Sequence, residues 1–261
     1  MDGMYEKMKL LAKWRLHRFY SKHSGIAAYL PPTTMLNVKT LTRYLNDYGT
    51  VYVKASTQHQ GRGVVKVWQA DEGYRFVRVR GKINKAATVQ ELVQRIKSGN
   101  PKQTFIVQRA IDLAKVKGKV FDIRVMMMRD GERKWQYGGM VAKVAGQGSV
   151  VSNVQQGRGY VMSVDQALRQ SLNYDEEQIE RVKKELISLS RTIMKHSKSY
   201  PFFSFQCGID LAVDTNGKVW IIEVNLHNPA HSLFKKLKNK TFYRRIGRLY
   251  WAYRKKHKKI I

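Results

Sequence analysis

Apolar residues recur along this chain with two spacings, one typical of helices and one typical of strands. Side chains about 3.6 residues apart predict helices with one buried face. Three segments have this spacing and are predicted as helices: 36–48, which Gly49 ends, 89–96, which Thr88 caps, and 175–196. Alternating charge predicts a further, exposed helix over 4–22, and Pro31 and Pro32 prevent its continuation.

Segments rich in β-branched residues predict strands. They lie at 50–56, 64–70 and 104–111, and two longer segments, 121–144 and 208–225, are predicted as hairpins. The first hairpin turns at Asp130 and Gly131, and the second turns at Asn216 and Gly217. Strands mixed with helices and hairpins, without an internal repeat, predict an α+β fold.

The hairpin over 208–225 carries acidic side chains among apolar ones. Asn216 followed by Gly217 is typical of a two-residue type I′ turn, which would place Thr215 opposite Lys218. Counting outward from that pair places Asp210 opposite Glu223. Directly opposed residues share one face of a sheet, and so do residues two apart on one strand.

Asp210, Glu223 and Asn225 are therefore expected to converge. Two carboxylates at close range repel each other unless a cation or a proton lies between them. Hard oxygen ligands of this kind suit Mg²⁺, which takes one or two protein carboxylates and completes its shell with water and phosphate. The alternative is a pair of carboxylates that form salt bridges with some of the many Lys and Arg side chains.

Two glycine-containing loops are candidates for phosphate binding. Lys54 ends a predicted strand just before a loop with Gly61 and Gly63, and backbone N–H groups at glycines can approach phosphate closely. The loop matches neither a Walker A motif nor a dinucleotide fingerprint. An ordinary surface hairpin turn is the alternative.

The second loop and the strand before it carry further polar candidates. Asp122 and Arg124 share a strand face, so Arg124 is either part of a structural ion pair or a catalytic arginine. Lys143, Asn153 and Arg158 lie around the second loop, where solvated polar residues need no functional explanation.

Charge distribution favours anionic partners. The 261 residues include 49 Lys or Arg and 19 Asp or Glu, a net charge of +30 that attracts nucleic acid, anionic membranes or wall polymers, or nucleotides. No nucleic-acid reading motif is present. After Glu223 come twelve Lys or Arg and no acidic residue, with helical periodicity through Phe242, Ile246, Leu249, Tyr250 and Tyr253. This tail predicts either a surface for an anionic polymer or membrane, or an amphipathic helix packed on the domain.

Cysteine usage and hydropathy bear on the compartment. A single cysteine, Cys207, excludes an internal disulfide and suits a reducing environment. The sequence shows neither a signal peptide nor an apolar run long enough to span a bilayer. A cytoplasmic protein is expected.

Six segments, taken in order, resemble an ATP-grasp enzyme: "VYVKASTQHQGRGVVKV", "TFIVQRAI", "FDIRVMMM", "VVSNVQQGRG", "FQCGIDLAVD" and "IIEVN". The resemblance covers about 13–225, is strongest to the YheC/YheD-like (endospore coat-associated) group, and extends more distantly to ribosomal-protein glutamate ligases. It implies two α+β lobes that clasp ATP. The implied division is an N-terminal helix and linker at 1–35, a small lobe at 36–110, a large lobe with the metal site at 111–235, and a basic amphipathic helix at 236–261.

The resemblance also implies roles for single residues. Lys54, with Lys13 as an earlier lysine, would contact the ATP phosphates, and Gly61, Arg62 and Gly63 would fold over them. The other implied nucleotide-binding residues are Lys143, Asn153 and the hinge beside adenine, Gln108, Arg109, Ala110 and Ile111. Asp210, Glu223 and Asn225 would hold two Mg²⁺ ions, or Mn²⁺. Arg124 and Arg158 would steady the transferring phosphoryl group and the acyl phosphate.

The implied activity is ATP-dependent ligation. A carboxylate becomes an acyl phosphate, which an amine or a thiol attacks, so no protein nucleophile is needed. Two departures concern the acceptor: the family's N-terminal domain is expected to be absent, and "EVNLHNPAHS" replaces the usual "EVNxxPG". The alternative is a cationic ATP-binding coat or interaction protein with little turnover, which the resemblance would associate with the spore or the envelope.

Overall fold

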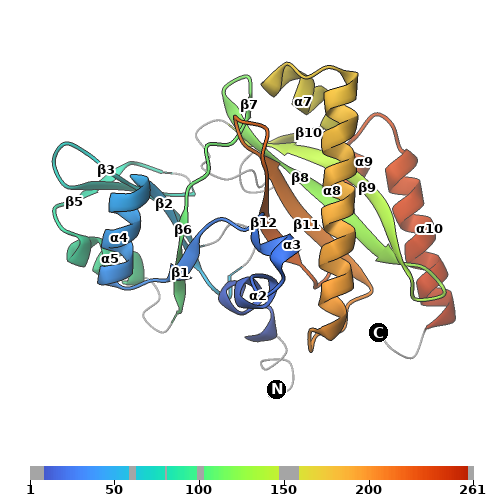
Figure 1. Ribbon diagram of the computed structural model, residues 1–261, viewed down its shortest axis with the longest axis horizontal. Coiled ribbons are helices and arrows are strands. Elements are labelled where there is room, and N and C mark those ends of the chain that lie inside the picture. The colour runs from blue at the N-terminus through green and yellow to red at the C-terminus, as the bar shows by residue number, and fades with distance from the viewer. Residues whose placement is uncertain (1–8, 59–62, 80, 99–102, 147–158, 258–261) are drawn as a thin grey trace.

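Two antiparallel sheets form the frame of the molecule (Figure 1). The computed structural model describes residues 9–58, 63–79, 81–98, 103–146 and 159–257. In the small lobe the strand order is β1-β6-β2-β3-β4-β5, and in the large lobe it is β10-β9-β8-β11-β12, with β7 paired to β8. These sheets and their helices confirm the predicted α+β class.

The strands of the small lobe are β1 (Thr33–Met35), β2 (Thr50–Ala55), β3 (Val64–Gln69), β4 (Tyr74–Arg78), β5 (Asn84–Ala86) and β6 (Phe105–Arg109). Those of the large lobe are β7 (Lys115–Val116), β8 (Lys119–Arg129), β9 (Trp135–Val144), β10 (Tyr160–Met162), β11 (Gln206–Val213) and β12 (Val219–Asn225). The helices are α2 (Lys13–Tyr20), α3 (Ser24–Ala27), α4 (Val38–Tyr48), α5 (Val89–Lys97), α7 (Val164–Leu172), α8 (Glu176–His196), the 3₁₀ turn Ser197–Ser199, α9 (Ser232–Lys235) and α10 (Thr241–Lys256).

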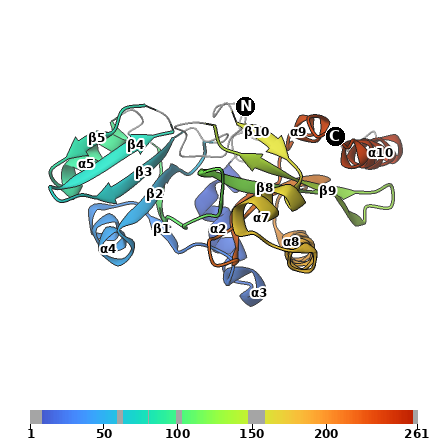
Figure 2. The ribbon, with the colours of Figure 1, turned by 90° about the horizontal axis from the view of Figure 1, so that it is seen from above.

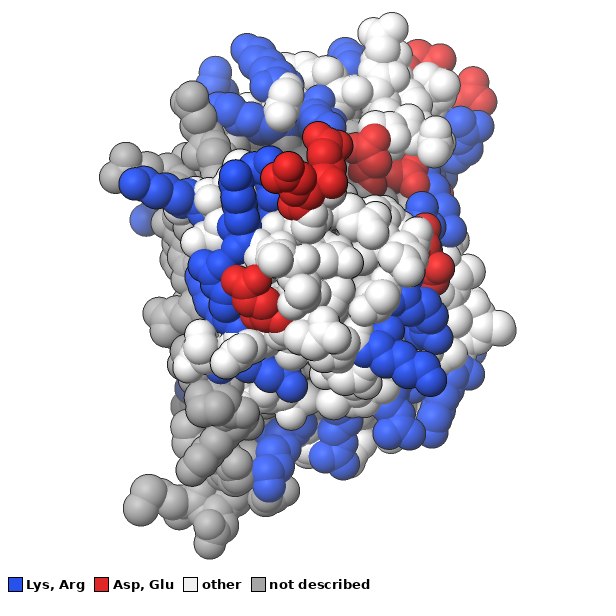
Figure 3. Space-filling view, turned by 90° about the vertical axis from the view of Figure 1, so that its left-hand side faces the viewer, with Lys and Arg blue, Asp and Glu red and all other residues white. Residues whose placement is uncertain are grey.

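Helices α4 and α5 cover one face of the small-lobe sheet. Leu41 and Leu45 on α4, with Leu92 and Ile96 on α5, pack against the valines of β2, β3 and β6. Both helices begin at a side-chain cap, and the cap of α5 is Thr88, as the sequence predicts. Figure 3 shows this end of the molecule, where acidic residues lie among many Lys and Arg.

The large-lobe sheet divides its two faces between a core and a polar site. On β8, Ile123, Val125 and Met127 point into the core beneath α8, so the alternate residues Asp122 and Arg124 point to the other face. Figure 2 shows α2, α3, α7 and α8 on the core side of this sheet and α9 and α10 on the opposite side. The polar residues of interest therefore share their face with α10.

Helix α10 covers the remaining part of that polar face. Ile246 is fully buried and packs with Phe234 against Met126, Met128 and Val141. The apolar periodicity predicted for the tail is therefore the contact face of a packed amphipathic helix. A bulge at Gly138 in β9 lies beside this contact, where an added Cβ on Gly138 would meet Ile246 at 3.1 Å.

The N-terminal helix differs from expectation. Of the predicted segment 4–22, α2 forms Lys13–Tyr20, and Leu16 and Tyr20 are buried in the core of the large lobe instead of exposed. The charge alternation in this segment concealed two apolar positions four residues apart, which lie on one helix face. Within the described residues, every helix is too short or too polar to cross a bilayer.

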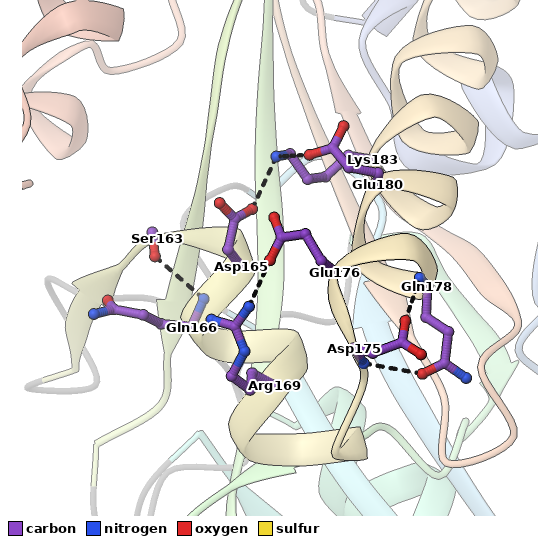
Figure 4. A network of polar contacts seen from close by, with 9 residues as sticks. All are labelled: Ser163, Asp165, Gln166, Arg169, Asp175, Glu176, Gln178, Glu180 and Lys183. Atoms are coloured by element: carbon purple, nitrogen blue, oxygen red, sulfur yellow. Dashed lines mark hydrogen bonds and ion pairs between the residues drawn. The ribbon is translucent and has the colours of Figure 1, made fainter.

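Polar contacts join α7 to α8 (Figure 4). Arg169 on α7 contacts Glu176 at 2.7 Å, and Lys183 on α8 contacts Asp165 at 3.1 Å. The first pair is exposed and the second is partly exposed, so each contributes at most about 1 kcal/mol. Asp175 caps α8 by accepting a hydrogen bond from the Gln178 N–H at 2.8 Å.

We predict that Asp175→Ala lowers the free energy of unfolding by about 1 kcal/mol, because it removes the cap of the longest helix. Urea unfolding followed by circular dichroism measures the change. Glu177→Gln, an exposed charge removal in the same turn, serves as the control. An equal loss in both variants would show that charge at the helix start, and not the cap, is responsible.

Candidate functional site

The hairpin of β11 and β12 has a different turn from the one predicted. The Asp214 N–H donates to the Lys218 carbonyl at 2.9 Å, so three residues form the loop and Thr215 is not opposite Lys218. The Asp214 carboxylate explains this turn, because one of its oxygens accepts hydrogen bonds from the N–H groups of Asn216 and Lys218. Gly217 adopts a φ of 84°, a value that favours glycine.

The predicted pairing of Asp210 with Glu223 is nevertheless confirmed. Leu211 pairs with Ile221, whereas Asp210 pairs with Glu223, so Ile222 is an extra residue in β12. This bulge shifts the register by one residue and cancels the shift introduced by the longer loop. Asp210 and Glu223 therefore lie opposite each other, as predicted, although the predicted two-residue turn is wrong.

Asp210 is the most enclosed member of the site. Its carboxylate accepts two hydrogen bonds from Arg124, at 2.6 and 3.0 Å, one from Lys143 at 2.9 Å and a longer one from Asn225 at 3.4 Å. Burial alone would raise the pKa of Asp210, but Arg124 and Lys143 outweigh that effect and hold this pKa below its usual range. Asp210 is therefore ionised at neutral pH.

Lys143 and Arg124 both have acidic partners on neighbouring strands. Lys143 on β9 is buried and contacts Asp122 at 2.8 Å, so the expectation of a solvated residue is wrong for it. Arg124 forms its ion pair with Asp210 on the neighbouring strand, and the negative charge of Asp122 on its own strand also acts on it. Cross-strand neighbours lie closer than residues two apart along one strand, which explains both choices.

Lys13 connects the two lobes. Its ammonium group donates to the Gln58 carbonyl beyond β2 and lies 3.3 Å from Glu223 on β12. Burial would raise the pKa of Glu223, but Lys13, with help from Lys54, lowers it on balance. The Glu223 side chain remains 27% exposed, compared with 7% for Asp210, so Glu223 is the more accessible carboxylate.

Lys54 on β2 approaches the same place from the small lobe. Its ammonium donates to Gln108 Oε1 at 2.6 Å, and Gln108 Nε2 donates to Thr33 Oγ1 at 2.8 Å. Burial lowers the pKa of Lys54 to about 8, with a smaller contribution from Lys13, while Glu223 opposes the shift. No motif in the sequence indicated Thr33, and Gln58 lies inside the segment "VYVKASTQHQGRGVVKV" without having been singled out as a contact.

The remaining predicted residues belong to the hinge beside Lys54, to the first loop, or to segments outside the described residues. Of the hinge, Gln108 is buried, Arg109 is exposed with its guanidinium 5.3 Å from the Tyr48 ring centre, and Ala110 and Ile111 follow the strand. Gly63 has a φ of 68°, and an added Cβ would come within 2.7 Å of Ala55 Cβ. Gly61, Arg62, Asn153 and Arg158 lie outside the described residues.

The oxygen donors can be tested for fit to a divalent cation. The described residues contain no group of three or more His, Cys, Asp or Glu that could hold a metal ion, so any ion here would need amide, water or phosphate oxygens as well. Glu223 and Asn225 offer a carboxylate and an amide oxygen, which suit Mg²⁺. Asp210 accepts four hydrogen bonds, as many as the roughly four lone-pair sites of a carboxylate. Asp210 could reach an ion only by giving up one of these contacts.

Comparison with known proteins agrees with the resemblance in the sequence. A family model described as YheC/D-like ATP-grasp matches residues 4–256. The endospore coat-associated protein YheD of Bacillus subtilis (strain 168) is 26% identical over 231 residues, which is 85% of this chain and 49% of that protein. The chain therefore spans about half the length of this relative.

Solved structures show the same fold. The C-terminal domain of K. lactis Pby1, an ATP-grasp enzyme that interacts with the mRNA decapping enzyme Dcp2, aligns with a TM-score of 0.52 and 15% identity over 90% of this chain and 69% of that one. N5-carboxyaminoimidazole synthetase from Staphylococcus aureus, solved with ADP, aligns with a TM-score of 0.54 and 9% identity over 87% of this chain and 47% of that one. At these identities the likeness concerns the fold alone.

We predict that Arg124→Met lowers the free energy of unfolding by about 3 kcal/mol at pH 7, because it leaves Asp210 buried with too little counter-charge. The combined variant with Asp210→Asn should lose clearly less than the sum of the two single losses. Urea titration of the four proteins measures this coupling. The effect should be complete above about pH 4 and disappear as the pH falls through the lowered pKa of Asp210.

Additive losses in the two single variants would contradict the ion pair. Lys115→Met, which breaks the exposed contact between Lys115 and Asp112, is the control and should leave the stability unchanged within error.

Proposed function

The chain belongs to the YheC/D-like ATP-grasp family, and from that membership we propose that it is a Mg²⁺/ATP-dependent ligase that joins a carboxylate to an amine or a thiol. The acceptor is proposed to be anionic or polymeric, given the net charge of +30. Family and fold support ATP binding, while the reaction and its residues are the proposal.

One observation carries the proposal: cationic side chains from both lobes converge on two carboxylates. Lys13 and Lys54 reach Glu223 from the N-terminal helix and the small lobe, and Arg124 and Lys143 hold Asp210 from the large lobe. A surface salt bridge joins one cation to one acid, whereas this cluster draws four cations from four separate elements around Asp210, Glu223 and the neighbouring Asp122. Such a cluster of cations and carboxylates suits a triphosphate with its metal ions, because that ligand also combines negative phosphate oxygens with positive metal ions.

The nucleotide is proposed to lie between the lobes. Lys54 and Lys13 would bind its phosphates, with the loop at 61–63 over them, and the segment 108–111 would lie beside adenine. Lys143 and Asn153 are further proposed contacts. Gln108 orients Lys54 through the 2.6 Å hydrogen bond, so the position of the ammonium is fixed before phosphate arrives.

The metal is proposed to bind first at Glu223 and Asn225, with Asp210 as a third oxygen donor. Two Mg²⁺ ions are proposed, with Mn²⁺ as a substitute; when bound they would offset negative charge on the phosphoryl oxygens. Arg124 lies next to Asp210 and, with Arg158, is proposed to neutralise the group that is transferred.

The proposed reaction has two steps. The carboxylate of one substrate takes the γ-phosphoryl group of ATP, which gives an acyl phosphate and ADP. An amine or thiol of the second substrate then attacks the acyl carbon, the C–O bond to phosphate breaks, and inorganic phosphate leaves. The protein positions both substrates and neutralises charge, so it needs no nucleophile of its own.

We predict that Glu223→Gln lowers Mg²⁺-dependent ADP release about a hundredfold, because it removes the accessible carboxylate proposed to hold the metal. ADP release is measured with Mg²⁺ and ATP in a screen of amino acids, short peptides and wall precursors. The matched control is Glu177→Gln, an exposed carboxylate at the start of α8. Equal ATP affinity with and without Mg²⁺, in the native chain and in Asp210→Asn/Glu223→Gln, would contradict the proposal.

We predict that ATP affinity falls as the pH rises from 7.5 to 9.5, by at most about tenfold per pH unit. In the free chain Lys54 has a pKa of about 8, and it loses its charge above that value. Phosphate selects the charged form, so binding requires proton uptake in this range. Titration calorimetry in two buffers of different ionisation enthalpy measures affinity and proton uptake. Lys54→Arg stays charged and should flatten the profile, and an equally steep profile in that variant would assign the effect to another group.

A second candidate is a cationic ATP-binding coat or interaction protein with little turnover. The observation that favours it is the basic, acid-free segment after Glu223, together with the coat association in the name of YheD. Its location would be the spore or the envelope, whereas the ligase is proposed to be cytoplasmic. ATP binding without acceptor-stimulated ADP release would favour this candidate over the ligase.

A further inference from the structure

Helix α10 lies on the same face of the large-lobe sheet as the candidate site. Met126 and Met128 continue the strand face that carries Arg124, and α9 and α10 cover them through Phe234 and Ile246. Figure 2 shows both helices on this side of the sheet. The part of the face that carries charged residues is therefore bounded by α9 and α10.

A groove of about 440 Å³ runs along α10. Gly247 lies within it, and an added Cβ there would meet no atom within 4 Å. Glycine weakens a helix interior relative to alanine, and no described residue lies close enough to require glycine at this position. The missing side chain leaves room for the backbone of another molecule.

The groove carries unneutralised positive charge and exposed rings. Arg244 and Arg248 both line it, one helical turn apart, and neither forms an ion pair with any described residue. Like charges four residues apart destabilise a helix. Tyr243, Tyr250 and Trp251 also line the groove, and the Trp251 side chain is 67% exposed. An anionic partner with flat or apolar groups would satisfy both features.

Polar contacts join the groove to the strand of Asp210. His231 lines the groove and its Nε2 lies 2.7 Å from Gln206 Oε1, and Gln206 Nε2 donates to Asn228 Oδ1 at 3.2 Å. Gln206 lies four residues before Asp210 on β11, on the same face. The loop that follows Asn225 therefore leads directly from the candidate site to the groove.

We propose that this groove docks an acidic peptide segment of the substrate whose carboxylate is activated at the candidate site. The inference rests on the proposed ligase function, which requires a carboxylate-bearing substrate. Arg244 and Arg248 would bind acidic side chains through their planar guanidinium groups. Apolar or aromatic side chains would pack on Tyr243, Tyr250 and Trp251, and the peptide backbone would pass over Gly247.

Other anionic partners fit the groove less well. A membrane would need the apolar face of α10, but Ile246 and Tyr253 on that face are fully buried. A phosphodiester chain could stack on the rings and pair with the arginines, but it offers no carboxylate for ligation. Both partners are outcomes of the test below.

The test measures binding of a fluorescein-labelled octapeptide of alternating Glu and Tyr to the full chain by fluorescence anisotropy. Arg244→Gln/Arg248→Gln removes the charges of the groove, and Gly247→Leu fills it. Lys236→Gln/Lys255→Gln removes the same charge from exposed positions outside the groove and is the matched control. Circular dichroism and ATP affinity are measured for each variant to verify folding.

We expect the dissociation constant of the peptide to rise at least tenfold in both groove variants and less than twofold in the control. A peptide with Gln in place of Glu should bind at least tenfold more weakly. Equal weakening in the groove variants and the control would overturn the proposal, as would tighter groove-dependent binding of oligo(dT) or of phosphatidylserine vesicles.

The same experiment separates the two proposals. Groove-dependent peptide binding without ADP release would leave docking in place and contradict the ligase. ADP release that is stimulated by an acceptor and unchanged in both groove variants would contradict docking alone. If Gly247→Leu fails to fold, the double arginine variant decides the result by itself.

Discussion

A carboxylate can be buried in a sheet only where counter-charges and hydrogen bonds replace its water. Asp210 meets this condition because β8, β9 and β11 lie side by side and deliver Arg124, Lys143 and Asp210 to one face. Because Asp210 needs these counter-charges, the side of the sheet that carries them is polar, and the opposite side forms the main core under α8. The same polar face ends at Met126, where α10 begins to cover the sheet.

Glu223 has the same charge and a different environment. It is more exposed than Asp210, and its cationic neighbours Lys13 and Lys54 come from outside the large-lobe sheet. Lys13 also binds the carbonyl of Gln58, so this contact depends on how the N-terminal helix and the small lobe meet the large lobe. One carboxylate thus stabilises the sheet internally, while the other lies where the lobes join and can exchange a lysine for a ligand.

The sequence predicted the class of the fold, the two hairpins and the pairing of Asp210 with Glu223. The predicted pairing is correct because two differences from the predicted hairpin cancel. The Asp214 carboxylate favours a turn that is one residue longer than predicted, and Ile222 is one extra, bulged residue in β12. The partners of Arg124 and Lys143 could not be predicted, because strand order within the sheet decides them. Helix α7 was not predicted, because its apolar face is short and can be recognised as a buried face only once its packing beside α8 is known.

We propose that the cluster of Lys13, Lys54, Arg124 and Lys143 around Asp210 and Glu223 binds a nucleotide with its metal. The most direct measurement is a crystal structure with Mn²⁺ and a non-hydrolysable ATP analogue, in which anomalous scattering locates the metal. We expect a manganese ion coordinated by Glu223 and Asn225, with the triphosphate against Lys54. A nucleotide bound elsewhere, or bound here with no manganese ion at Glu223, would contradict the claim.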